Sequence, residues 1–235
     1  MTFAPDPWLS DLLGKPAWHC SGACHELYPQ DLPIPPAFVS AKTPVEDRAG
    51  ILQLMSLGFG LADTNIQLTR PVCHGETDAV RPAIRFARPS DDRAVRLLAR
   101  EAFIHDRFHR DPLIPDSVAS RIKEEWAGNF FHGRRGDWLV VAEDADGLVG
   151  FLQLLRGPEN VLTIDLIAVA AQARGRRMGR AMIQYAAVQC LGVPARMRVG
   201  TQLTNLPSLA LYTGLDFRIT DASHIWHRHL EEQKG

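Results

Sequence analysis

The chain has 235 residues, a formal net charge of −1 at pH 7 and 46% hydrophobic residues. This composition is typical of a globular protein and excludes a disordered or fibrous chain. The near-neutral charge gives no support for bulk nucleic-acid binding, so any anion site has to be local. No apolar run reaches the roughly 18 residues of a membrane helix. The start of the chain does not resemble a signal peptide, so a cytoplasmic protein without membrane contact is expected.

The N-terminal part is proline-rich at first and then becomes periodic. Residues 46–59 carry apolar side chains at helical spacing, and Gly58 stands where a helix commonly ends. Residues 60–70 alternate like a strand. The polar stretch at residues 74–83 is expected to be a linker.

From Ala83 onward the predicted order is β-α-α-β-β-β-α-β-α-β, which indicates an α/β fold with a mixed sheet covered by helices. Residues 161–169 are nearly all apolar, as expected of a central strand covered on both faces. We therefore predict two domains, a smaller one at residues 1–80 and a main one at residues 81–235.

One internal similarity connects the two parts. Residues 54–63 resemble residues 212–221, with a leucine, a phenylalanine, an aliphatic residue and an aspartate at matching positions. The simplest account is a helix-turn-strand unit used twice, which makes residues 1–80 a partial copy of the second half of the main domain. Chance similarity is the alternative.

Zinc-type ligands occur in two short stretches, at His19, Cys20, Cys24, His25, Cys73 and His74. Cys-x3-Cys with a single distant Cys-His pair fits known zinc patterns poorly. Four irregularly spaced cysteines also do not suggest a disulfide framework. Ordinary thiols are expected, and no metal site is predicted.

The segment QARGRRMGRA, residues 172–181, lies between the central strand and a predicted helix. The first amides of a helix have no intrahelical partner and point along the positive end of its dipole. Gly175 and Gly179 would let an anion approach the backbone. Four side chains add charge, namely Arg174, Arg176, Arg177 and Arg180. A phosphate cradle is favoured over the alternative, a solvated basic turn.

With its flanking elements, this segment resembles the GNAT superfamily of acyl-CoA-dependent N-acetyltransferases. The family signature Arg/Gln-x-x-Gly-x-Gly/Ala matches residues 174–179, except that Arg177 replaces a glycine. The resemblance implies that acetyl-CoA is the co-substrate and that residues 174–180, Met178 included, bind its pyrophosphate. It also implies that pantetheine lies along the central strand, at Leu166, Ile167, Ala168 and Val169, where an amide would hold the thioester carbonyl.

Asn205 and Tyr212 are seven residues apart, so they would share one face of a helix. In the GNAT family an asparagine here binds pantetheine and a tyrosine lies beside the thioester sulfur. A phenol could protonate the leaving thiolate, so Tyr212 is predicted to be the general acid. The alternatives are a helix N-cap for Asn205 and a core position for Tyr212. Leu54 matches Tyr212 in the repeat, which favours a non-catalytic N-terminal part.

The chain offers two candidates for the general base that would take a proton from the amine. Asp165 on the central strand and Glu101 at the end of a helix are candidates, and a chain of water molecules is the alternative. Asp165 could equally hold a structural hydrogen bond.

The acceptor site would be built by residues 102–126, the stretch between the first strand and the hairpin in this superfamily. Arginines bind phosphate and aromatic rings stack on bases or sugars, so Arg107, His109 and Arg110 are predicted to bind substrate. The alternative to substrate binding is a structural role, as a charged loop that covers an apolar contact.

Residues 47–229 resemble most closely the TDP-4-amino-4,6-dideoxygalactose (TDP-fucosamine) acetyltransferase branch, notably in AREAFIHDRFHRDPLIPDS and MRVGTQLTN. This implies direct transfer of acetyl to the amine of a sugar nucleotide. The alternatives are a GNAT enzyme for another amine, such as a protein, amino acid or antibiotic, and a non-catalytic acyl-CoA-binding module. The oligomeric state stays open, a homodimer included.

Overall fold

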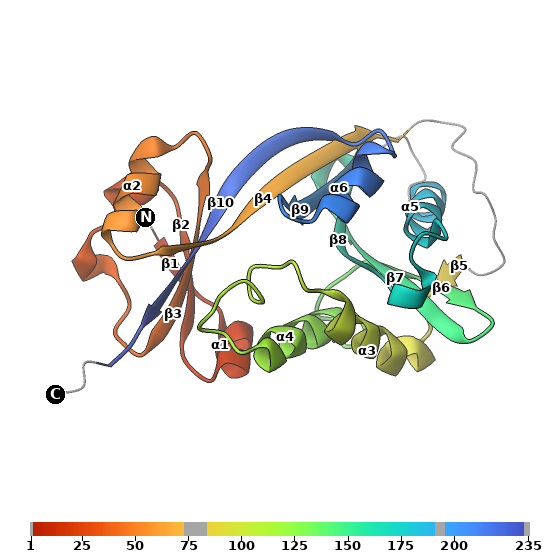
Figure 1. The fold of residues 1–235 in the computed structure, drawn as a ribbon, viewed down its shortest axis with the longest axis horizontal. Coiled ribbons are helices and arrows are strands. Elements are labelled where there is room, and N and C mark those ends of the chain that lie inside the picture. Colours follow the sequence, from red (N-terminus) through yellow and green to blue (C-terminus); the bar gives the residue numbers. More distant parts are fainter. Residues whose placement is uncertain (1, 73–83, 191–195, 233–235) are drawn as a thin grey trace.

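The computed structural model describes residues 2–72, 84–190 and 196–232. Its main feature is a ten-stranded mixed sheet with strand order β1-β2-β3-β10-β4-β9-β8-β7-β6-β5 (Figure 1). The strands are β1 (Thr2–Pro5), β2 (Ala17–Ser21), β3 (Ala37–Pro44), β4 (Gly60–Pro71), β5 (Ile84–Phe86), β6 (Trp138–Asp144), β7 (Gly147–Arg156), β8 (Val161–Val169), β9 (Arg196–Gln202) and β10 (Arg218–Leu230).

Helices cover both faces of the sheet. They are α1 (Pro7–Leu13), α2 (Arg48–Ser56), α3 (Asp92–Ala102), α4 (Asp116–Gly128), α5 (Met178–Gln189) and α6 (Leu206–Thr213). Helices α3 and α4 pack against each other on one face, and α5 and α6 lie on the opposite face (Figure 1). The predicted α/β class and the mixed sheet are confirmed.

The repeated unit predicted from the sequence is present as α2-β4 and α6-β10. The turns of both units use a left-handed backbone, with φ of 75° at Gly58 and 64° at Asp216. Their final strands are exchanged: β4 pairs with β9 of the C-terminal part, and β10 pairs with β3 of the N-terminal part. The two exchanged strands also pair with each other.

This exchange joins the two predicted domains in one sheet. The predicted linker, residues 74–83, falls outside the described residues. On either side of it, residues 1–80 and 81–235 contribute strands to one sheet. The N-terminal part is therefore not a separate sheet beside the main domain, because β4 is an inner strand flanked by β9 and β10. A fragment starting at residue 81 would lack that strand.

The apolar core has three parts. The largest fills the space around β6 to β9, α3 and α5, and a second lies under α2 in the N-terminal part. A third joins α1, β3 and α4 through Leu9, Phe38, Phe108 and Ile122. It packs the loop between α3 and α4 against the N-terminal part, which places that loop under the sheet.

Within the three described ranges, no helix is long and apolar enough to cross a membrane. Among the same residues, no three His, Cys, Asp or Glu side chains gather as metal ligands. Cys20 and Cys24 are buried, His19 contacts the Ser40 hydroxyl at 3.3 Å, and His25 is exposed. Cys73 and His74 fall outside the described residues.

Candidate active site

The site forms where two neighbouring strands separate. Strands β8 and β9 pair in parallel only from Val161 to Ile164 on β8, opposite Arg196 to Val199 on β9. Beyond Ile164, β8 keeps its pairing with β7 on one edge, while its other edge has no strand partner in the described chain. The backbone of residues 165–169 on that edge can therefore receive an extended ligand as an added strand.

The loop after β8 presents a run of free amides. Among the described residues, the backbone N–H groups from Gly175 to Arg180 donate to no carbonyl, and the first helical bond of this region runs from Ala181 to Arg177. Successive unpaired amides at a helix start form a concave anion site. Arg174 is braced by its Nε bond to the Val169 carbonyl at 3.3 Å. The loop therefore has the free amides and the cationic side chain that a phosphate site requires.

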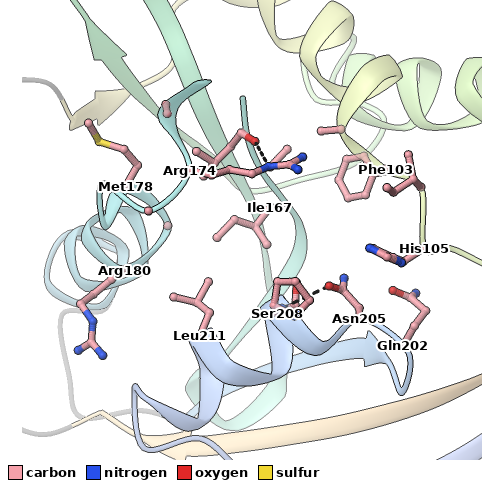
Figure 2. Close-up of a pocket in the computed structure, with 18 of the residues that line it drawn as sticks. Phe103, His105, Ile167, Arg174, Met178, Arg180, Gln202, Asn205, Ser208 and Leu211 are labelled. Carbon is pink, nitrogen blue, oxygen red and sulfur yellow. Dashed lines mark hydrogen bonds between the residues drawn. The ribbon is translucent and has the colours of Figure 1, made fainter. Parts of the chain in front are cut away.

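A cavity of about 450 Å³ joins the open edge of β8 to this loop. Figure 2 shows β8 at its back, α5 on one side, α6 below and the segment after α3 on the far side. The predicted cofactor residues that line it are Ile167, Ala168, Val169, Arg174, Gly175, Arg177, Met178, Gly179, Arg180 and Asn205. Two predicted residues do not line it: Leu166 is buried on the other side of β8, and Arg176 points to Asp144 at 3.5 Å.

Glycine is suited to each position of the signature for a different structural reason. A Cβ at Gly179 would lie 3.2 Å from Leu211 Cδ2 and close to Ile167 and Val169, so this position is confined between α5, α6 and β8. Gly175 has φ of 76° and open space around it. Arg177, where the family has glycine, adopts φ of 62°. The family glycine therefore serves the left-handed backbone, and the exposed Arg177 side chain swings out to the cavity rim.

We expect Arg177→Gly to raise the free energy of unfolding by about 0.5–1 kcal/mol. Relief of the left-handed strain exceeds the extra chain entropy of glycine in the unfolded state. Arg177→Ala is the matched control, because it removes the same charge but keeps the Cβ in the left-handed region. Urea denaturation of both variants measures the difference. Equal midpoints for the glycine and alanine variants would show that the backbone at this position is not strained.

Asn205 fits both of its predicted roles. It is the N-cap of α6, where its Oδ1 accepts from the Ser208 amide at 3.3 Å, and it also lines the cavity. Its amide nitrogen stays available to a ligand, because the capping bond uses the oxygen.

Tyr212 lies deeper than expected. Its side chain is 2% exposed, packs on Phe217 with ring centroids 5.5 Å apart, and is not among the residues that line the cavity. Burial raises the pKa of the phenol, so it stays protonated at neutral pH. Ser208, one turn earlier, and Leu211 do line the cavity. The neutral phenol can donate a proton, as the prediction of a general acid requires.

Asp165, which was predicted as a general base, is held in an ion pair. Arg135 donates to both carboxylate oxygens at 2.7 and 2.6 Å. The indole N–H of Trp126 and the amide of Gln153 donate at 3.0 and 3.2 Å. The pKa of Arg135 is raised by its bonds to Asp165. Oδ2 accepts three of these hydrogen bonds and Oδ1 accepts one, so the carboxylate is held as a hydrogen-bonded ion pair. Glu101 is exposed and outside the cavity lining.

Of the three residues predicted to bind the acceptor, only Arg110 lines one of the two cavities. Arg107 lies 4.6 Å over the Phe108 ring, and His109 bridges Asp106 at 2.6 Å and Ser120 at 3.2 Å. Neither lines the main cavity or the smaller cavity at Arg110, and both side chains make internal contacts. Arg110 does line one, a smaller cavity of about 90 Å³ with Asp63. It donates to the Ala62 carbonyl and the Thr204 hydroxyl.

Several lining residues escaped the sequence reasoning, including Phe103, His105, Gln202, Ser208 and Leu211. His105 belongs to the segment expected to bind the acceptor, so its residue type was a usable signal. The others have no distinctive chemistry, and only the packing of α6 and β9 reveals their place.

Comparisons with known proteins agree with this geometry. The chain is 30% identical over 141 residues to the spore coat polysaccharide biosynthesis protein SpsD of Bacillus subtilis, which covers 59% of this chain and 48% of that protein. The chain thus spans about half of that relative's length. It is 27% identical to dTDP-fucosamine acetyltransferase of Escherichia coli, over 74% of each chain.

Solved structures share the fold. A GCN5-related N-acetyltransferase from Sphaerobacter thermophilus aligns with a TM-score of 0.57 and 13% identity, over 83% of this chain and 61% of that one. A tandem GNAT protein from the clavulanic acid biosynthesis pathway aligns with a TM-score of 0.55 and 15% identity, over 81% and 63%. The sequence profile of the acetyltransferase (GNAT) family matches residues 95–217. This chain belongs to the acetyltransferase (GNAT) family.

Proposed function

We propose that the protein transfers the acetyl group of acetyl-CoA to a primary amine by direct attack. The observation that carries this proposal is the cavity that joins the unpaired edge of β8 to the free amides of residues 175–180. Pantetheine would pair with the edge at residues 167–169, and the pyrophosphate would bind the loop amides with Arg174 and Arg180. An amide on β8 would then stabilise the developing oxyanion of the thioester carbonyl.

The acceptor that we propose is the 4-amino group of a nucleotide-linked amino sugar. Support comes from the names of the two relatives, one a dTDP-fucosamine acetyltransferase and the other a protein of polysaccharide biosynthesis. The smaller cavity beside Arg110 adds a cationic group near the main one. Arginine is well suited to bind the diphosphate of a sugar nucleotide.

Acetyl-CoA at 100 times its Kd is expected to stabilise the fold by about 2.7 kcal/mol. For a chain of this size that corresponds to a rise in Tm of roughly 5–10 °C. Differential scanning fluorimetry with acetyl-CoA measures it, and dephospho-CoA, which lacks the 3′-phosphate, serves as a weaker-binding comparison. No shift at millimolar acetyl-CoA would contradict the cofactor assignment.

Thiol release then identifies the acceptor. The panel contains TDP-4-amino-4,6-dideoxygalactose, the corresponding free amino sugar, a lysine peptide and an aminoglycoside. We expect the sugar nucleotide to be acetylated with the highest kcat/KM. Preference for another amine would retain the enzyme class and replace the acceptor. Binding of acetyl-CoA without turnover on any amine would instead favour an acyl-CoA-binding module.

A further inference from the structure

The acid–base groups of the main cavity are few. The charged or titratable residues that line it are His105, Asp106, Arg174, Arg177 and Arg180. The three arginines stand at the pyrophosphate loop and on α5, and a guanidinium cannot take up a proton. The walls formed by β9 and α6 contribute neutral side chains, Gln202 and Asn205 among them. Two groups are left that could accept a proton from an amine, His105 and Asp106.

Asp106 is already committed to internal partners. Its side chain accepts from the Phe108 amide at 2.9 Å and from His109 Nδ1 at 2.6 Å, and Lys123 Nζ lies 3.8 Å away. Burial opposes ionisation of this carboxyl, yet His109 and Lys123 hold its pKa below the usual value. Asp106 is therefore an anion anchored in the loop, and not a group that collects a proton from substrate.

His105, unlike Asp106, is not engaged by internal hydrogen bonds. It is partly buried, and neither ring nitrogen has a hydrogen-bond partner among the described residues. Figure 2 shows the imidazole between Phe103 and Gln202, facing Asn205 across the cavity. It stands on the side of Ile167 away from the pyrophosphate loop. That side is where the acetyl end of a cofactor would lie if its pyrophosphate bound residues 175–180.

The anchoring of its neighbour holds His105 in place. Asp106, the next residue, is fixed through His109 and Lys123, and Phe108 is 1% exposed in the core that joins α1, β3 and α4. An imidazole without internal partners, on a fixed backbone at the acetyl end of the cavity, can accept a proton from an amine.

We infer that His105 is the general base of the transfer, an inference that rests on the function proposed above. The amine nitrogen forms a bond to the thioester carbonyl carbon while His105 takes one proton from that nitrogen. The carbon–sulfur bond then breaks, and the thiolate leaves as CoA-SH after it receives a proton from the general acid. The products are the acetamide and CoA-SH; the imidazolium returns its proton to solvent, and the general acid takes up one proton from solvent.

The test compares His105→Ala with the wild type, using TDP-4-amino-4,6-dideoxygalactose or the best acceptor of the panel above. General-base catalysis typically contributes 10²- to 10⁴-fold, so kcat should fall at least about 100-fold. The Tm rise caused by acetyl-CoA should be unchanged, which shows that the variant folds and binds its cofactor. His132→Ala is the matched control, because His132 is exposed and distant in sequence from the cavity lining.

Two further readouts separate proton transfer from positioning. The decline of kcat toward acid pH should disappear in His105→Ala, and added imidazole should restore part of kcat. A kcat within threefold of wild type would overturn the inference. It would also be overturned if His105→Ala lost turnover but its kcat still declined toward acid pH and was not restored by imidazole. If the wild type acetylates no amine while binding acetyl-CoA, the proposed function itself fails, and that outcome is visible before any variant is made.

Discussion

Replacing Tyr212 by phenylalanine is expected to lower kcat by about 100-fold or more, because the variant cannot protonate the departing sulfur. The hydroxyl has no hydrogen-bond partner among the described residues, so its loss should leave the free energy of unfolding nearly unchanged. This combination distinguishes a catalytic phenol from a core tyrosine. A residue that merely fills space beside Phe217 would leave kcat intact.

The measurement is kcat at saturating acetyl-CoA, together with a urea denaturation curve. Tyr28→Phe is a control for the loss of a phenol elsewhere, since Tyr28 is 54% exposed. If Tyr212→Phe turns over at the wild-type rate, the phenol is a core group and the proton for the sulfur comes from another source. The burial of Tyr212 makes this test informative, because the side chain is 2% exposed and is not among the residues that line the cavity.

The second large effect concerns stability. Asp165→Ala is expected to lower the free energy of unfolding by about 2–4 kcal/mol, because the indole N–H of Trp126 and the amide of Gln153 lose their acceptor. The Arg135 side chain is 41% exposed, so water can solvate its guanidinium in the variant. This solvation limits the decrease in the free energy of unfolding. The rate of the folded variant should change little, since Asp165 holds a structural ion pair.

Asp165→Asn is the matched variant, because its amide oxygen can still accept from Trp126 while the charge is gone. We expect it to lie between wild type and the alanine variant in urea denaturation. A stable Asp165→Ala protein that has lost more than 100-fold in kcat would restore Asp165 as the general base and remove that role from His105.

The sequence alone was informative wherever function depends on neighbouring residues in the chain. The apolar run at residues 161–169 and the start of α6 at Asn205 are local patterns, and the structure has a strand and a helix N-cap there. The glycines and arginines at residues 174–180 are a third local pattern, and their phosphate-binding role stays a prediction. The amides that form a phosphate site come from one turn of backbone, so the residues that form it are contiguous in sequence.

The remaining features depended on contacts between distant segments. The pairing of β4 with β9 joins residues more than a hundred positions apart, and no local periodicity encodes which strand lies beside which. The burial of Tyr212, the ion pair of Asp165 with Arg135 and the free ring of His105 follow from that packing. Sequence by itself determined that a strand, a loop rich in glycine and arginine and a helix follow one another at residues 161–189. Only the tertiary structure decided which side chains face the cavity, because orientation and burial are set by the neighbours that folding brings together.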